Sequence, residues 1–209
     1  MRRFIRYAAF FAIAAGIVSL ALPIAAGWNP FRPALRMDAS LLRDGDIIFI
    51  RGATVRGMAV ALAEKSSPYS HTGIIHKEGG STWVIHATPS GDSDYVCRDS
   101  LDDFLAISGT RHAAVCRALP EFSDIAVRAA KRAEFYYSEK YPFDGKFSLK
   151  SEDSLYCTEL VWRAYLDAGL DLSEGRRDDV SFPLIDEPVL LPSSLLRSKY
   201  LSVVANEGL

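Results

Sequence analysis

The sequence predicts an α+β fold, in which an antiparallel sheet packs against helices. Short runs rich in β-branched residues recur between turn-forming residues, and two longer segments have the spacing of amphipathic helices. Of the 209 residues, 49% are hydrophobic and 24% are charged, a composition typical of a globular protein with a packed core. About 180 residues follow the apolar N-terminus, which suits one domain.

The N-terminal segment has the pattern of an export signal. Arg2, Arg3 and Arg6 precede an uncharged, apolar stretch at 7–28. The basic end should stay on the cytoplasmic side while a hydrophobic helix inserts in the membrane. The following domain is therefore expected to be exported, in the periplasm or on the extracytoplasmic face of the membrane.

Removal and retention of residues 1–28 both remain open. The small residues at 25–27 suit a cleavage site, whereas the apolar stretch is close to the roughly 20 residues that span a bilayer and suits an anchor. Residues 29–40, with two prolines, are expected to form a linker. The folded domain is then predicted to occupy residues 41–209.

The elements of this domain can be predicted in chain order. A helical turn is expected at 39–42, strands at 46–50, 72–77, 82–87, 94–98, 113–119 and 201–204, and helices at 54–64, 100–105, 123–137 and 155–168. The turn Glu78-Gly79-Gly80-Ser81 predicts a hairpin between the second and third strands. Ser100 is expected to cap the short helix, and Gly169 to end the last one.

Charge and cysteine content narrow the classes of partner and cofactor. The net charge is −2 without long runs of one sign, so nucleic acid is not an expected partner. Cys97, Cys116 and Cys157 lack the spacing of a disulfide framework or a zinc cluster. The sequence therefore implies no metal and no organic cofactor, and it leaves the oligomeric state open.

Cys157 lies where the last helix is expected to start. The partial positive charge of a helix N-terminus stabilises a thiolate and lowers its pKa from about 8.5, while first-turn N–H groups can donate to an oxyanion. His71 begins one strand of the predicted hairpin, and His86 lies on the other. The hairpin would bring both imidazoles together, with His71 as a base and His86 orienting its ring.

Structural explanations compete with this reading. A lone cysteine in an amphipathic helix is usually a small buried hydrophobe, and a single strand histidine is usually structural. His76 and His112 are expected to be structural. Cys97 and Cys116 fall within strand-like runs and are expected to be packing residues.

Four motifs in one order carry a family resemblance: Gly45 to Phe49 (GDIIF), Ser70 to Ile75 (SHTGII), Val84 to Ala87 (VIHA) and Tyr156 to Val161 (YCTELV). Together they resemble the NlpC-type papain-like cysteine hydrolases. The cysteine helix comes last, so the chain is similar to the circularly permuted branch, the YiiX-like and YaeF-like amidases related to lecithin:retinol acyltransferase. The resemblance covers about 41–169 and implies a permuted papain-like fold.

The resemblance also implies site roles. Cys157 matches the nucleophile, His71 the base and His86 the third, orienting residue, a position where relatives often carry a carboxylate or amide. Tyr156 matches an aromatic position beside the nucleophile. Tyr141 belongs to an aromatic loop that suits an apolar pocket wall, and both tyrosines are candidate substrate-binding residues or packing residues.

The function expected from these features is an extracytoplasmic thiol hydrolase. It would cleave amide or ester bonds through an acyl-cysteine intermediate, on cell-wall peptides or on lipid-linked acyl groups, and it would reach the membrane through its N-terminal segment. An acyltransferase that uses the same cysteine and histidine is one alternative. A membrane-anchored, non-catalytic binding module on this fold is the other.

Overall fold

A computed structural model describes residues 35–51, 67–89, 94–107, 112–180 and 187–207. The predicted N-terminal hydrophobic helix and the predicted helix at 54–64 lie outside the described residues. Within the described ranges, no helix is long and apolar enough to cross a membrane.

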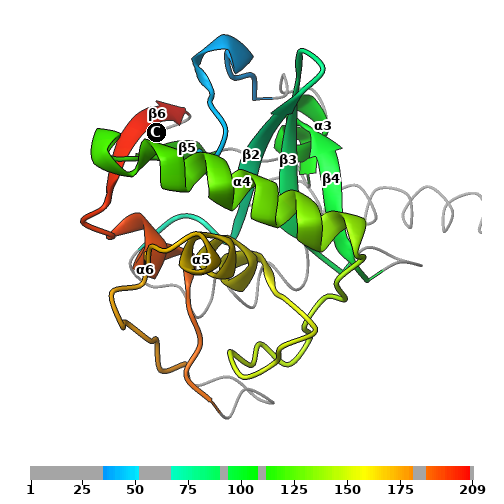
Figure 1. The fold of residues 1–209 in the computed structure, drawn as a ribbon, viewed down its shortest axis with the longest axis vertical. Coiled ribbons are helices and arrows are strands. Elements are labelled where there is room, and N and C mark those ends of the chain that lie inside the picture. The colour runs from blue at the N-terminus through cyan, green and yellow to red at the C-terminus, as the bar shows by residue number, and fades with distance from the viewer. Residues whose placement is uncertain (1–34, 52–66, 90–93, 108–111, 181–186, 208–209) are drawn as a thin grey trace, which may run out of the picture. The chain divides into compact units, whose positions relative to one another are not determined.

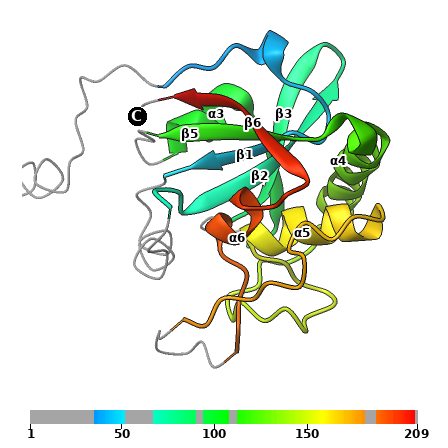
Figure 2. The same ribbon diagram turned by 90° about the vertical axis from the view of Figure 1, so that its left-hand side faces the viewer.

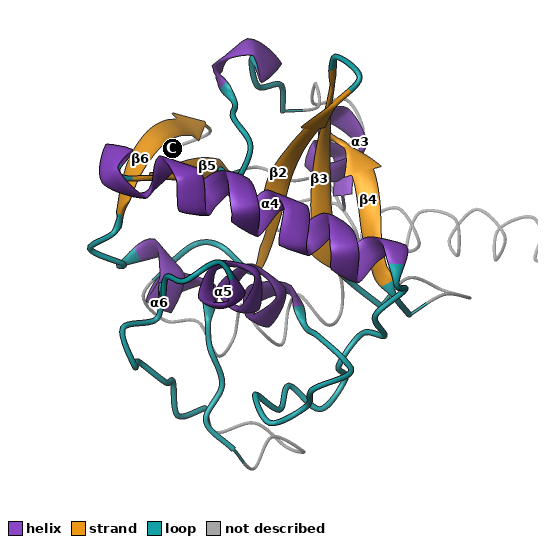
Figure 3. Ribbon diagram, viewed as in Figure 1, coloured by secondary structure: helices purple, strands orange, loops and turns teal. Residues whose placement is uncertain are grey.

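One antiparallel sheet of six strands forms the centre of the described fold, in the order β4-β3-β2-β1-β5-β6. Figures 1 and 3 show β2, β3 and β4 side by side behind α4. The strands are β1 (Ile47–Ile50), β2 (His71–Glu78), β3 (Ser81–Ala87), β4 (Val96–Ser100), β5 (Ala113–Ala118) and β6 (Leu201–Glu207). The predicted antiparallel sheet is therefore confirmed.

Helices pack against both faces of this sheet, with α3 on one side and α4 and α5 on the other (Figure 2). The helical elements are η1 (Ala39–Leu41), α3 (Leu101–Ala106), η3 (Pro120–Phe122), α4 (Ser123–Ser138), α5 (Cys157–Asp167) and α6 (Pro192–Leu196). Side chains alternate between the faces of a strand. In β2, Ile74 therefore joins the core under α4 and α5, whereas Ile75 joins the core with α3.

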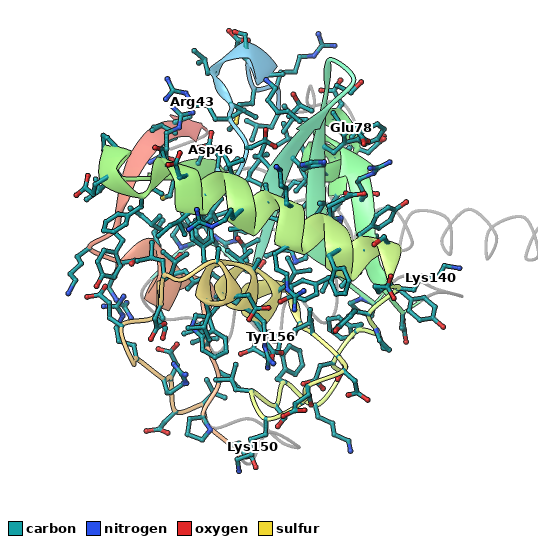
Figure 4. All side chains as sticks on the ribbon, viewed as in Figure 1. Arg43, Asp46, Glu78, Lys140, Lys150 and Tyr156 are labelled. Carbon is teal, nitrogen blue, oxygen red and sulfur yellow. The ribbon has the colours of Figure 1, made fainter. Side chains whose placement is uncertain are left out.

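The Gly-Asp motif before β1 joins the sheet to α4. Gly45 has φ of 82°, and a Cβ there would lie 2.3 Å from the carbonyl oxygen of Ala126, so glycine allows the close approach of the helix. Asp46 is 1% exposed, accepts two hydrogen bonds from the Arg117 guanidinium and accepts another from the backbone N–H of Arg43. Figure 4 shows Arg43 and Asp46 close together at this end of α4. The motif has a structural role.

Most predicted elements agree with the structure to within a few residues, and two differences bear on the site. The strand predicted at 94–98 runs from Val96 to Ser100, so it includes Asp99. The helix predicted from 155 begins at Cys157. A further helix, α6, was not predicted, although Pro192 is its first residue and proline at that position favours a helix start.

Candidate active site

Cys157 is the first residue of α5, and Tyr156 precedes it with an extended backbone. The residue is 6% exposed, and its sulfur lies 3.8 Å from the hydroxyl oxygen of Thr158. Burial raises the pKa of the Cys157 thiol, although hydrogen bonds from Thr158 and from the backbone of Thr72 oppose the rise. The lowered pKa that was expected is therefore wrong, because loss of hydration raises the pKa by more than the hydrogen bonds to the sulfur lower it.

His71 and His86 come together across the hairpin of β2 and β3. Ile74 pairs with Ile85, so the two histidines are diagonal neighbours on one face of the strand pair. The distance between His71 Nε2 and His86 Nδ1 is 2.9 Å. The predicted hairpin and the predicted proximity of the two rings are confirmed.

Two neighbours fix the positions of these rings. A Cβ on Gly73 would lie 2.6 Å from Val84 Cγ1 and 3.2 Å from His86 Cβ, so a larger residue would displace the strand that carries His86. Phe104, from α3, stacks on the His71 ring and meets the His86 ring edge-on, with centroids 5.5 and 4.9 Å away. The pair is thereby packed on the face of the sheet that α3 covers.

Asp99 extends the pair by one residue and was not predicted from the sequence. Its Oδ2 lies 3.0 Å from His86 Nε2, and the hydrogen bond from His86 lowers the pKa of the Asp99 carboxyl. Cys97 is directly opposite His86 in the strand pair, and Asp99 lies two residues further on the same face. This alternation would have pointed to Asp99 had the predicted strand not ended at 98.

The order of these groups determines which ring nitrogens carry protons. His86 needs a proton on Nε2 to donate to the Asp99 carboxylate, so its Nδ1 has a free lone pair. That lone pair accepts the N–H on His71 Nε2. The remaining nitrogen of a neutral His71, Nδ1, is therefore unprotonated and able to act as a base.

The two proposed catalytic residues, Cys157 and His71, are linked through the backbone of Thr72 and not by a direct bond. Among the described residues, no hydrogen bond joins the Cys157 sulfur to the His71 ring, and the sulfur instead interacts with the backbone of Thr72, the residue after His71. Burial, with a smaller effect of His86, holds the pKa of His71 well below 6.5. Both partners are consequently neutral near pH 7.

Cys97 differs from the buried packing residue that was expected. It is partly exposed, and its sulfur lies 3.3 Å from His86 Nε2. Burial and the charge of Asp99 raise the pKa of this thiol to about 12. Cys116 is 1% exposed in the core as predicted, and all three cysteines are free.

The two tyrosines occupy packed positions. Tyr156 lies at α5 (Figure 4), is 2% exposed, and its hydroxyl oxygen accepts the backbone N–H of Leu190 at 2.8 Å. Tyr141 packs on the ring of Tyr136, with centroids 5.0 Å apart. These contacts favour packing roles for both side chains, and contact with substrate stays a prediction.

The other histidines lie apart from this group. His76 Nδ1 is 3.2 Å from Asp44 Oδ1, and the backbone carbonyl of His112 accepts the N–H of Arg51. These contacts are consistent with the structural roles expected of both.

A cysteine at a helix start, a strand histidine and a second polar residue on an antiparallel sheet define the papain-like class of hydrolase folds. Residues 41–205 match the family described as permuted papain-like amidase enzymes of the YaeF/YiiX type. The chain belongs to this family, as the motif order predicted. The family is one of amide-bond hydrolases.

Two relatives from Escherichia coli support this assignment. The uncharacterized protein YiiX of strain K12 is 27% identical over 183 residues, which cover 78% of this chain and 86% of the relative. A crystal structure titled metalloprotein yiiX is 28% identical, with a TM-score of 0.64, and the match covers 79% of this chain and 97% of that one. The likeness therefore extends over nearly the whole of each relative.

Proposed function

We propose that this protein is an extracytoplasmic thiol hydrolase that cleaves amide bonds through an acyl-cysteine intermediate on Cys157. The observation that carries the proposal is the hydrogen-bonded chain from Asp99 through His86 to His71, whose sequence neighbour Thr72 contacts the Cys157 sulfur through its backbone. Such a chain has a use in acyl transfer, because it fixes the tautomer of a base next to a nucleophile.

In the first half of the reaction, His71 Nδ1 accepts the thiol proton as the sulfur bonds to the substrate carbonyl carbon. Catalytic hydrogen bonds are often looser before substrate binds, so the Cys157 sulfur turns toward His71 in the complex. Backbone N–H groups of Cys157 and Thr158, which already favour the thiolate, are placed to donate to the carbonyl oxygen as it becomes negative. The C–N bond then breaks, and the amine leaves with the proton from His71.

In the second half, water resolves the acyl-cysteine. His71 Nδ1 takes a proton from water, the resulting hydroxide attacks the carbonyl carbon, and the carboxylic acid leaves as the sulfur recovers its proton from His71. His86 accepts the His71 N–H throughout. The Asp99 carboxylate favours the positive charge that develops on His71 in both halves.

Location and substrate rest on the sequence. The arginine-flanked apolar segment at 7–28 supports export, with the domain on the far side of the membrane. Cell-wall peptides and lipid-linked acyl groups are both accessible there. We favour amide substrates among them, because the family is one of amidases.

A metal must also be considered, because one solved relative is titled a metalloprotein. The described residues contain a group with suitable donors, His86, Cys97 and Asp99, whose ligand atoms lie within 4.8 Å of one another. Imidazole, thiolate and carboxylate are the donors that zinc uses in proteins, so the residues fit such an ion. An ion of this type would supply a positive charge next to His86, and the hydrolytic steps above do not need it.

The test compares wild type with Cys157→Ala and a matched variant, Cys116→Ala, which removes a buried thiol outside the site. The full-length proteins are incubated with cell-wall peptides and, separately, with phospholipids, and products are read by mass spectrometry. We expect wild type and Cys116→Ala to release the same amide-cleavage product and Cys157→Ala to release none. Trapped acylated peptide containing Cys157 would support the intermediate directly.

Two results would contradict the proposal. Undiminished cleavage by Cys157→Ala would remove the nucleophile from the mechanism. Transfer of the acyl group to an added amine or alcohol, with no hydrolysis in water alone, would make the protein an acyltransferase instead.

A further inference from the structure

Three side chains of types that bind metal ions lie together on β3 and the edge strand β4. His86 in β3 pairs directly with Cys97 in β4, and Asp99 follows two residues later. The side chains of residues two apart in a strand point to the same face, so Cys97 and Asp99 both lie on the His86 side. His86 Nε2 is 3.3 Å from the Cys97 sulfur and 3.0 Å from Asp99 Oδ2.

We propose that His86, Cys97 and Asp99 form a binding site for one divalent transition-metal ion of the zinc type, and that an ion bound there switches off the proposed thiol hydrolase. The second half of this proposal rests on the function proposed above; the first half does not.

The two separations to His86 suit a tetrahedral ion after small movements, and the third, between Cys97 and Asp99, is within 4.8 Å. With metal–nitrogen and metal–oxygen bonds near 2.1 Å and a metal–sulfur bond near 2.3 Å, ligand atoms around a tetrahedral ion are about 3.4 to 3.6 Å apart. The two separations to His86 Nε2 are a few tenths of an ångström shorter, which side-chain rotation can correct. The thiol proton of Cys97 leaves to solvent when its sulfur binds the ion.

Exposure provides an entry path for the ion. The His86 side chain is 1% exposed and the Asp99 side chain 36%, and Cys97 is partly exposed. The ion would therefore enter from the Asp99 side, with a buried imidazole as its inner ligand. Three protein ligands leave the fourth position for water.

The hydrogen bond between the two imidazole rings connects the metal site to His71, because it determines which ring nitrogens carry protons. When the Nε2 lone pair of His86 is held by a metal, the proton of the neutral His86 ring is on Nδ1. The His86 N–H then donates to His71 Nε2, which reverses the hydrogen bond that the Asp99 carboxylate imposes. A neutral His71 now carries its proton on Nδ1, the atom that must accept the thiol proton of Cys157. His71 therefore loses its capacity to act as the base.

Cobalt(II) titration tests the site without reference to activity. Full-length protein is stripped with a chelator and titrated with Co²⁺, and thiolate-to-cobalt charge-transfer absorption is followed. We expect one Co²⁺ per chain in wild type and in Cys157→Ala, and no charge-transfer band in Cys97→Ser, with circular dichroism to verify its fold. Loss of a supporting residue outside the ligand shell costs about 10- to 100-fold in metal affinity, so loss of this ligand should cost at least about 100-fold.

The outcomes separate the candidate sites. A band that persists in Cys97→Ser and disappears in Cys157→Ala would place the ion on the proposed nucleophile and overturn the site. Absence of Zn²⁺ and Co²⁺ binding to wild type by calorimetry would overturn it as well.

The regulatory half is tested by the reactivity of Cys157. Alkylation by iodoacetamide is followed by mass spectrometry of the peptide that contains Cys157, with and without Zn²⁺. We expect Zn²⁺ to slow alkylation at least tenfold in wild type, reversibly by chelator, and to leave the rate in Cys97→Ser unchanged. An equal alkylation rate in wild type with and without bound Zn²⁺ would overturn the proposed switch, but it would not contradict the proposed metal site. Because this readout needs no substrate, it judges the switch even if the protein cleaves no amide.

Discussion

Replacement of Asp99 by asparagine tests the hydrogen-bonded chain at its outermost member. Asparagine keeps the size of the side chain and can still accept the His86 N–H, so the change removes chiefly the negative charge. That charge favours the protonated form of His71, which exists transiently in each proton transfer of the proposed mechanism. The expected effect is a slower reaction of Cys157 without loss of the fold.

The size of the effect follows from the geometry. The His71 and His86 ring centroids are 5.0 Å apart, and Asp99 Oδ2 lies 3.0 Å beyond His86 Nε2, which puts the carboxylate about 9 Å from the His71 ring. At an effective dielectric constant of about 20, two charges at that distance interact by about 2 kcal/mol. The Asp99 side chain is 36% exposed, so solvent screening reduces this to roughly 1 to 1.5 kcal/mol. We therefore expect a decrease of about tenfold.

The assay is the rate of Cys157 alkylation at pH 7 in the presence of a chelator, which removes any metal effect, together with kcat/KM on any substrate that is found. Asp102→Asn is the matched control, because Asp102 is exposed in the first turn of α3 and carries the same charge. Its rate should equal that of wild type, and the Tm of both variants should stay within a few degrees of wild type. Equal alkylation rates for Asp99→Asn and wild type would refute this reasoning, and would show that the charge of Asp99 does not contribute to the reactivity of Cys157.

Two further predictions concern stability. Gly73→Ala should destabilise the fold by about 1 to 3 kcal/mol, because the new Cβ meets Val84 and His86; Gly145→Ala, where a Cβ has open space, should not, and urea denaturation distinguishes them. Burial raises the pKa of Glu159 to about 7 in the folded protein, from 4.5 in the unfolded chain. Between pH 4.5 and pH 7 the folded state therefore binds more protons than the unfolded state. The contribution of Glu159 to the free energy of unfolding consequently falls as the pH rises through this range. Relative to wild type, Glu159→Gln should thus gain up to about 3 kcal/mol between pH 5 and pH 8, and parallel pH profiles of the two proteins would contradict this.

Local patterns predicted the parts of the fold that depend on local physics. The hairpin of β2 and β3 could be read from the Gly79-Gly80 turn, because such a turn fixes the pairing of its flanking strands. The Ser100 cap could be read in the same way, and its hydroxyl accepts the N–H of Asp103 as expected. The hairpin alone brings His71 and His86 together, without reference to the rest of the chain.

The remaining parts of the site depend on contacts that composition does not encode. β4 lies at one edge of the sheet and carries polar residues, so its strand pattern is weak and Asp99 escaped notice. The rise in the Cys157 pKa comes from burial, which a helix start alone does not reveal. The position of Cys157 at a helix start can be read from the sequence. How deeply the fold buries the thiol, and so how much free energy ionisation requires, cannot.

The proposed chemistry depends on strand register. A slip of one residue between β2 and β3 would turn His86 to the face covered by α4 and α5, and would break its bonds to His71 and Asp99 together. A slip between β3 and β4 would leave His86 in place but turn both Cys97 and Asp99 away from it. The first error would leave the base, His71, without its orienting partner, and the second would leave His86 without Asp99 and would also dismantle the proposed metal site. One register at this edge of the sheet therefore assembles both the proposed catalytic chain and the proposed metal site, whichever order the motifs take along the chain.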